Sequence, residues 1–149
     1  MLKAEKLAQT LLKEASVLHL ATSNKSGRIA NCALEFAEYE GKLYWRSGKG
    51  SEHSKNLKTG GSCHVCITRT NMDGSGEGIQ SPGKATQLTK LIEITIAKTL
   101  LDEKIIKKRS RTVSSEEDKR EYWVFSPTKL FYMNENNFGY DRIELKRSK

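Results

Sequence analysis

The first half of the chain consists of short segments with the composition of β-strands, separated by turn residues. The three clearest segments are 16–22, 28–36 and 42–46. Gly27 and Gly41 lie in the turns between them, and glycine readily adopts the left-handed backbone conformation that tight turns need. Strands joined by such short turns pair antiparallel, because a parallel connection needs a crossover of a dozen or more residues. The pattern predicts a β-meander, the beginning of a small barrel or sandwich.

The second half of the chain continues the strand pattern. Strand-like segments recur at 62–70, 79–88, 121–125 and 129–133. The segment 79–88 is expected to bend or bulge at 81–83, where a proline and a glycine interrupt it. Together with the meander, these segments predict six to seven antiparallel strands and a mainly β (β+α) fold class.

Two segments have helical spacing of their apolar residues. Residues 3–15 predict an amphipathic N-terminal helix, and residues 88 to about 108 predict a long helix after the fifth strand. On this long helix Leu88, Ile92, Ile96 and Leu100 form one apolar stripe, and Ala97, Leu101 and Ile105 lie beside it. A chain of 149 residues has the length of one domain. We therefore expect residues 1–149 to form one small barrel with helices packed at its openings.

The segment that follows the third strand gathers groups that can bind a phosphate. It runs from Tyr44 to Leu57 and contains Gly48, Gly50, several hydroxyl groups, lysines and His53. A short helix is expected to begin near His53, and the first turn of a helix presents backbone N–H groups that a phosphate can satisfy. The same composition also occurs in hairpin turns with solvated lysines. By itself this segment favours the simple turn, so its function depends on the rest of the chain.

The charge of the chain limits its partners without choosing among them. There are 26 Lys and Arg residues against 18 Asp and Glu residues, a net charge of +8. Such a charge favours phosphorylated ligands, nucleic acids or acidic surfaces. The densest basic segment, 104–111, has no interleaved aromatic residues for base stacking, so nucleic-acid binding is the less favoured of these. No segment is apolar enough for a membrane span or a signal peptide, and we expect a cytoplasmic protein.

The cysteines do not predict a disulfide framework or a metal site. Their number, three, is odd, which fits reduced thiols in the cytoplasm. Cys63 and Cys66 have the spacing of a metal or redox motif but lie in a strand-like segment. Residues three apart on a strand point to opposite faces, so these two thiols should not share a metal.

Several segments occur in an order and at a spacing that one known family shares. They are 18–22, Gly27, 43–47, 53–57, 78–80 with Gly83 and Ala85, 123–127, and 138–139. This pattern resembles the pyridoxamine 5′-phosphate oxidase-related family of flavin-binding split barrels, and it covers nearly the whole chain. The resemblance implies an antiparallel split barrel that forms a homodimer and holds FMN in a cleft between the subunits.

The resemblance also implies which residues bind the flavin. In such proteins a hydroxyl at the end of the third strand and a cation before an Asn-Leu pair hold the phosphate, and these positions are Ser47 and His53. The second strand lies against the isoalloxazine ring and offers backbone groups to it. The complete set of flavin-binding candidates is Asn31, Cys32, Ala33, Trp45, Arg46, Ser47, His53, Ser54, Lys55 and Gln80.

The sequence departs from the family pattern in ways that affect the expected activity. His53 occupies a position where relatives often have Lys or Arg, and histidine is only partly charged near neutral pH. The chain also lacks the Arg-rich second strand and the Trp-x-Arg ending of true pyridoxamine phosphate oxidases; its ending is Phe138–Arg142. The resemblance therefore implies an FMN-dependent oxidoreductase or flavin carrier without a defined substrate or catalytic residue. A haem- or deazaflavin-binding barrel and a basic nucleic-acid-binding module are the alternatives.

Overall fold

The structure is a computed structural model that describes residues 2–60, 62–109 and 119–146. Within these ranges the helices are α1 (Lys3–Glu14), α2 (Glu52–Lys58), α3 (Leu91–Arg109) and α4 (Glu135–Phe138). The strands are β1 (Val17–Ser23), β2 (Ile29–Glu35), β3 (Ala37–Tyr39), β4 (Lys42–Ser47), β5 (Cys63–Thr70), β6 (Gly76–Gln87), β7 (Glu121–Pro127), β8 (Phe131–Asn134) and β9 (Ile143–Glu144). The predicted order of elements is confirmed, with the short strand β3 and the helix α4 as additions; β9 lies in the closing segment 138–145, for which loop and strand character was predicted.

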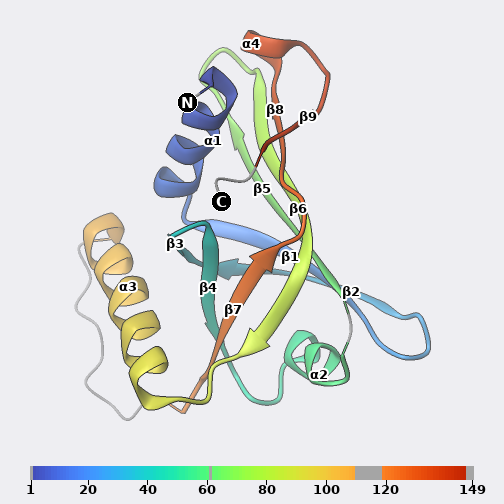
Figure 1. Cartoon of the computed structure of the whole chain (residues 1–149), viewed down its shortest axis with the longest axis vertical. Coiled ribbons are helices and arrows are strands. Elements are labelled where there is room, and N and C mark those ends of the chain that lie inside the picture. The colour runs from blue at the N-terminus through green and yellow to red at the C-terminus, as the bar shows by residue number, and fades with distance from the viewer. Residues whose placement is uncertain (1, 61, 110–118, 147–149) are drawn as a thin grey trace.

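All nine strands in the described ranges belong to one antiparallel sheet with the order β2-β1-β5-β6-β7-β4-β3. The long strand β6 pairs with β7 through Gly83–Gln87 and with β8 through Glu77–Gln80, and β9 pairs with β8. The end strands β2 and β3 do not pair with each other, so the barrel is open along that line (Figure 1). The predicted antiparallel split barrel with an N-terminal helix is confirmed. The long helix was predicted after the fifth strand and follows the sixth, β6. The count differs by one because β3 is a separate strand that the prediction did not include.

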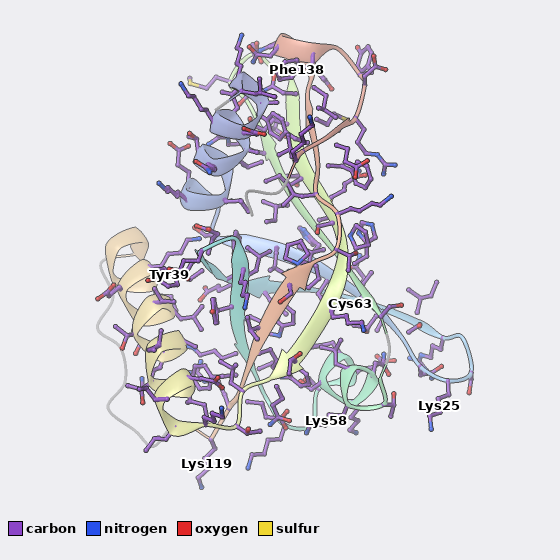
Figure 2. The ribbon with its side chains drawn as sticks, viewed as in Figure 1. Lys25, Tyr39, Lys58, Cys63, Lys119 and Phe138 are labelled. Carbon is purple, nitrogen blue, oxygen red and sulfur yellow. The ribbon has the colours of Figure 1, made fainter. Side chains whose placement is uncertain are left out.

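Apolar residues at alternate strand positions form the core inside the sheet (Figure 2). In β1, Leu18 and Leu20 are fully buried while His19 between them is exposed, as the period of two requires. Trp45 on β4 and Trp123 on β7 lie directly opposite each other and are almost completely buried. The inner face of α1 closes one opening of the barrel with Ala8, Leu11 and other buried residues.

The structure buries only one part of the apolar face predicted for the long helix. Ile92 and Ile96 are 70% and 48% exposed, whereas Ala97 and Leu101 are buried against the sheet. The reason is that Leu88 does not belong to the helix: its backbone N–H donates to the carbonyl of Tyr122, and α3 begins only at Leu91. Small Ala97 lets the helix approach β4 and β7 closely. Of the helices in the described ranges, none combines the length and the apolar character that crossing a membrane requires.

At 81–83, where a bend or bulge was predicted, β6 continues without a bulge against β5, and on its other side it changes partner from β8 to β7. Pro82 pairs with His64, and Gly83 pairs with Cys63 on one side and Pro127 on the other. A Cβ atom at Gly83 would lie 2.5 Å from the ring of Phe125 and from the carbonyl oxygen of Ser126. The glycine therefore permits close packing of β6 against β7 and does not mark a bulge.

Candidate functional site

Three serine hydroxyls and an imidazole form one hydrogen-bonded chain where β4 ends and α2 begins. The Ser47 Oγ lies 2.9 Å from the Ser54 Oγ, which accepts a hydrogen bond of 2.7 Å from the Ser51 hydroxyl. The Ser51 Oγ also lies 3.3 Å from the His53 Nε2. The loop 48–50 brings these residues together by reversing the chain between the strand and the helix. The structure thus brings together three of the predicted phosphate ligands and adds Ser51.

Burial divides this cluster into an inner and an outer part. Ser54 is completely buried and Ser47 is 7% exposed, because Ser47 lies on the inward face of β4 with Trp45. Their hydroxyls satisfy each other, so a ligand at the surface does not reach them directly. Ser51 and His53 are half-buried and lie on the outer side. The position of Ser51, directly before a short helix, is the signal in the sequence that could have identified it.

Partial burial lowers the pKa of the His53 imidazole below its usual value, because desolvation disfavours the charged form. The imidazole is therefore mostly neutral near pH 7 when no anion is present. A phosphate beside it would favour the protonated form and raise this pKa again. His53 can consequently act as a cation for a phosphate, but only by taking up a proton when the phosphate binds.

The acidic residues around the cluster are paired, whereas two of its lysines are not. Glu52 lies 3.2 Å from the guanidinium of Arg28, and both side chains are largely exposed. The buried Glu121 is opposite Ser47 in the sheet and is paired with Lys58 at 2.6 Å. Among the described residues, the exposed Lys49 and Lys55 form no ion pair. The outer side of the cluster therefore has an excess of positive charge, which favours an anion.

The helix α2 is fixed to the barrel from its inner side. The amide of Asn56 donates to the hydroxyl of Thr22 on β1 at 3.1 Å, and both residues are buried. Leu57 packs into the core, and the pair Lys58–Glu121 ties the end of the helix to β7 (Figure 2 labels Lys58). These contacts hold the Ser51 and His53 side chains in place at the rim of the sheet, where α2 packs against β1 and β2.

Trp45 and Arg46 lie apart from this cluster. The Trp45 side chain is fully buried in the core beside Phe125. Arg46 points to the other side of β4, where its guanidinium is 2.6 Å from the carboxylate of Asp102 on α3 and 3.4 Å from the hydroxyl of Tyr122. Both side chains thus have partners within the protomer, Trp45 in the core and Arg46 in an ion pair, and their contact with a flavin stays a prediction.

The outer face of β2, β1, β5 and β6 carries most of the other predicted residues. The register aligns Ala33, His19, Cys66 and Gln80 in one row across the four strands. Asn31 and Ala33 are exposed on this face, whereas Cys32 points inward and packs against the core, so only its backbone is accessible at the surface. The Gln80 side chain accepts a hydrogen bond of 3.1 Å from Arg142.

The part of this face that β1, β2 and β5 form is almost uncharged, although 30% of the residues in the chain are charged. Its exposed or half-buried members on β1, β2 and β5 are Val17, His19, Ala21, Ser23, Ile29, Asn31, Ala33, Glu35, His64, Cys66, Thr68 and Thr70. Glu35 is the one formal charge among them. The edge strand β2 also pairs on one side only, so it retains free backbone groups on the other. Such a surface is suited to contact with another molecule.

The cysteines lie as the strand pattern predicts. The buried Cys63 donates from its Sγ to the Gly83 carbonyl at 3.7 Å, and Cys66 is on the opposite face of β5. Burial raises the pKa of the Cys63 thiol to about 11, so the thiol stays protonated at neutral pH. In the part of the chain that the structure describes, no three His, Cys, Asp or Glu residues are grouped in a way that could hold a metal ion.

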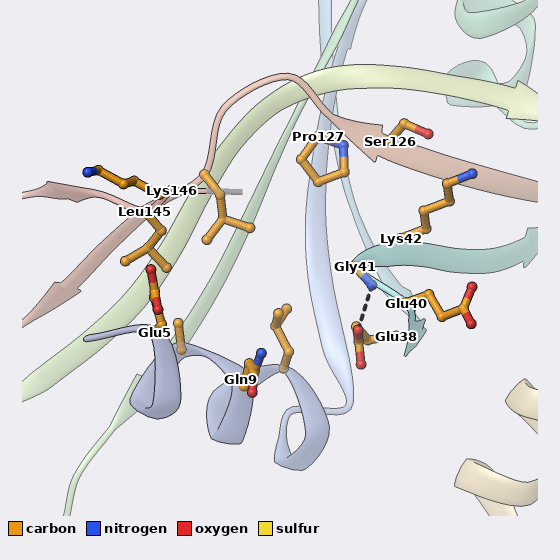
Figure 3. Close-up of a pocket in the computed structure, with 13 residues that line it drawn as sticks. Glu5, Gln9, Glu38, Glu40, Gly41, Lys42, Ser126, Pro127, Leu145 and Lys146 are labelled. Atoms are coloured by element: carbon orange, nitrogen blue, oxygen red, sulfur yellow. Dashed lines mark hydrogen bonds between the residues drawn. The ribbon is translucent and has the colours of Figure 1, made fainter. Parts of the chain in front are cut away.

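A cavity of about 660 Å³ lies elsewhere, between α1, the β3–β4 turn and the β7–β8 connection (Figure 3). None of the predicted flavin-binding residues lines it.

The comparisons with known proteins find the same fold at low sequence identity. No family model and no curated protein matches the sequence. A heme binding protein from Mycobacterium smegmatis has a TM-score of 0.76 and 15% identity, with 98% of this chain and 59% of that chain covered. This chain thus spans less than two thirds of that protein.

Two other solved structures match over most of both chains. An FAD-binding protein from Mesorhizobium loti has a TM-score of 0.69 and 15% identity, covering 87% of this chain and 92% of that chain. A protein of the pyridoxinephosphate oxidase family from Clostridium acetobutylicum, related to general stress protein 26, has a TM-score of 0.69 and 12% identity, covering 95% and 92%. At these identities the similarity establishes the fold and not the ligand.

Proposed function

We propose that this chain, which has the split-barrel fold of the pyridoxamine 5′-phosphate oxidase-like proteins, binds FMN between two subunits and acts as an oxidoreductase. The observation that carries the proposal is the hydrogen-bonded cluster of Ser47, Ser51, His53 and Ser54 at the junction of β4 and α2. It presents a hydroxyl and an ionisable imidazole at the rim of a barrel whose solved relatives include an FAD-binding protein.

In this proposal Ser51 and His53 contact the phosphate of FMN. Lys49 and Lys55 add positive charge from the exposed side of the loop and helix. The buried pair Ser47 and Ser54 supports them from below, because the Ser54 oxygen accepts the hydrogen bond that orients the Ser51 hydroxyl. The role of Ser47 and Ser54 is thus to position Ser51, which differs from the direct contact that the resemblance implies.

The isoalloxazine ring would lie along β2. The free edge of this strand offers backbone N–H and C=O groups at alternate residues of the segment Asn31–Ala33, and these groups suit the polar edge of the ring. The uncharged outer face would be covered by the same face of a second copy, and Gln80 would reach the flavin from there or from its own chain. Two copies are needed because one protomer leaves this face open to water.

When bound, FMN supplies the hydride and electron transfer, and the chain supplies position and environment. Ser51, His53 and the lysines would hold the phosphate, and β2 would orient the ring. The second subunit would exclude water from one face of the ring. The substrate would then be determined by the shape of the remaining opening, where no side chain has an evident acid–base role.

A titration of the purified protein with FMN, followed by flavin absorbance and fluorescence, tests the proposal. The double variant Ser51→Ala with His53→Ala should weaken FMN binding about tenfold or more, because each charge-assisted hydrogen bond contributes on the order of 1.5–3 kcal/mol. The exposed hydroxyl of Thr95 on α3 provides a matched control, and Thr95→Ala should leave the affinity unchanged. Protein that does not bind FMN, or a double variant with unchanged affinity, would show that the site is misplaced.

The subunit arrangement has its own test. Ala33 is exposed on the outer face, so Ala33→Arg should not disturb the folded protomer. The substitution should prevent dimer formation, which sedimentation measures, and it should weaken FMN binding at the same time. Thr99→Arg on the exposed side of α3 is the control and should change neither. A dimer that survives Ala33→Arg would exclude this face as the contact.

Haem is the second candidate ligand, because one similar structure is a heme binding protein and two histidines lie on the outer face. His19 and His64 are exposed on neighbouring strands and could each act as an axial ligand. The absorption spectrum distinguishes the candidates, since haem has an intense Soret band that flavins lack. Haem binding that depends on His64, without FMN binding, would favour this candidate over FMN.

A further inference from the structure

The cavity of about 660 Å³ has the size of a binding site for a small molecule (Figure 3). It lies beside α1, away from α2, and is therefore independent of the proposed flavin site (Figure 1). Two half-buried carboxylates, Glu5 on α1 and Glu38 on β3, lie on its walls. Nothing in the proposed flavin function uses this cavity.

Each of the two carboxylates has one oxygen in use and one available. Glu5 accepts a hydrogen bond of 3.1 Å from the backbone N–H of Leu2 through its Oε2. Glu38 accepts one of 2.9 Å from the backbone N–H of Gly41 through its Oε1. Among the described residues, neither carboxylate forms an ion pair. In a chain with a net charge of +8, two unpaired carboxylates in one cavity favour a cationic ligand.

The wall between the two carboxylates is mostly apolar. It consists of Ala8, Leu12, Leu130 and Leu145, with Pro127 above them. Lys42 and Lys146 also line the cavity, and in Figure 3 their ammonium groups point away from Glu5 and Glu38. The Glu40 carboxylate at the rim also points away.

The spacing of the carboxylates argues for a ligand with two charges. Gln9 lies four residues beyond Glu5, a rise of about 6 Å along the axis of α1. Figure 3 shows Glu38 farther on in the same direction, at the other end of the cavity. One ammonium group could not contact both carboxylates across this distance.

We propose that the cavity binds a linear aliphatic diammonium compound. One ammonium group would pair with the free oxygen of Glu5 and the other with that of Glu38. The methylene chain between them would pack against Leu12, Leu130 and Leu145, which bury its apolar surface. A monoamine of the same length would satisfy only one carboxylate, and a diol would satisfy neither charge.

Calorimetric titration of the full chain with cadaverine, spermidine and pentylamine tests this proposal. Cadaverine or spermidine should bind in a saturable manner, and pentylamine should bind at least about tenfold more weakly because it lacks the second charge. Glu5→Gln and Glu38→Gln keep an acceptor for the Leu2 and Gly41 N–H groups while removing the charge. Each should weaken diamine binding about tenfold, and together they should abolish it.

Glu40→Gln is the matched control, because this exposed carboxylate points away from the cavity and its replacement should not change the affinity. An equal loss in Glu40→Gln would mean that the amines bind only to general surface charge. Equal binding of pentylamine, or unchanged binding in the double variant, would overturn the proposal. A thermal melt confirms that the variants are folded, and FMN titration should be the same in all of them.

Discussion

Lys58 Nζ lies 2.6 Å from the Glu121 carboxylate, which is almost completely buried at the start of β7. The other oxygen of Glu121 has no hydrogen-bond partner among the described residues. A buried carboxylate with so few partners depends strongly on its one cation. This pair therefore connects the stability of the barrel to the helix that bears the candidate phosphate ligands.

Replacing Lys58 by Met should destabilise the protein by about 2–3 kcal/mol, because it leaves a buried charge without compensation. Chemical denaturation of Lys58→Met, Glu121→Gln and the double variant measures the coupling. The double variant should be more stable than Lys58→Met alone, since it removes the unpaired charge. Additive effects of the two substitutions would contradict this account of the pair.

Replacing Gly83 by Ala should destabilise the protein by about 1–3 kcal/mol, the usual cost of overpacking. The new Cβ would lie 2.5 Å from both Phe125 and the backbone of Ser126, so β6 and β7 would have to separate. Gly48→Ala is the control, because a Cβ there meets no atom within 4 Å. The free energies of unfolding of the two variants should differ clearly, and equal values would refute the packing argument.

The affinity for FMN should depend on pH through His53. Its pKa is lowered by burial in the free protein and should rise when a phosphate binds, so binding takes up a proton. The contribution of His53 to affinity should therefore increase as the pH falls from 8 toward about 6. The FMN phosphate gains its own proton near pH 6, which opposes this trend.

The variant His53→Gln separates the two effects, because both proteins share the titration of the phosphate. The ratio of the dissociation constant of His53→Gln to that of the wild type should grow on acidification. A ratio that does not change with pH would mean that His53 carries no charge in the complex.

The stability of the folded chain should fall in alkaline solution through Tyr132. Burial raises the pKa of this tyrosine from 10.0 to about 12; the hydrogen bond with Asn134 opposes this rise, and the contact with Glu77 adds to it. The folded state therefore keeps the proton that the unfolded state loses. The stabilisation is fully present below about pH 10 and is lost as the pH rises toward 12.

Tyr132→Phe should reduce the dependence of the free energy of unfolding on pH in this interval. Some dependence should remain, because the pKa of the buried Cys63 thiol is raised to about 11 and acts in the same direction. The measurement is chemical denaturation at several pH values above 9. An unchanged slope in Tyr132→Phe would show that Tyr132 does not titrate as its burial requires.

The order and type of the elements were predictable because they depend on local patterns. Alternation in 16–22 and helical spacing in 3–15 correspond to β1 and α1 almost residue for residue. The turn glycines behave as expected, with positive φ at Gly27 and Gly41. The closeness of Ser47, His53 and Ser54 was also predictable, because they are near one another in sequence; their role in binding a phosphate stays a prediction.

The errors arose where a residue's environment is set by remote segments. Ile92 and Ile96 have the same helical spacing as the buried residues Ala97 and Leu101. Only the packing of the helix against β4 and β7 decides which of these side chains are buried. The sequence also could not show that α3 brings the Asp102 carboxylate beside the guanidinium of Arg46. Periodicity carries no information about such partners, because it describes one element at a time.

The sequence by itself determined that this chain forms an antiparallel barrel with a hydroxyl- and glycine-rich loop after one of its inner strands, because turns and strand alternation act over a few residues. Only the tertiary structure decided that Ser47 and Ser54 are buried while Ser51 and His53 face outward, and that the face with Asn31 and Ala33 stays uncovered. Burial depends on which distant segments pack together, and that follows from the folded sheet as a whole.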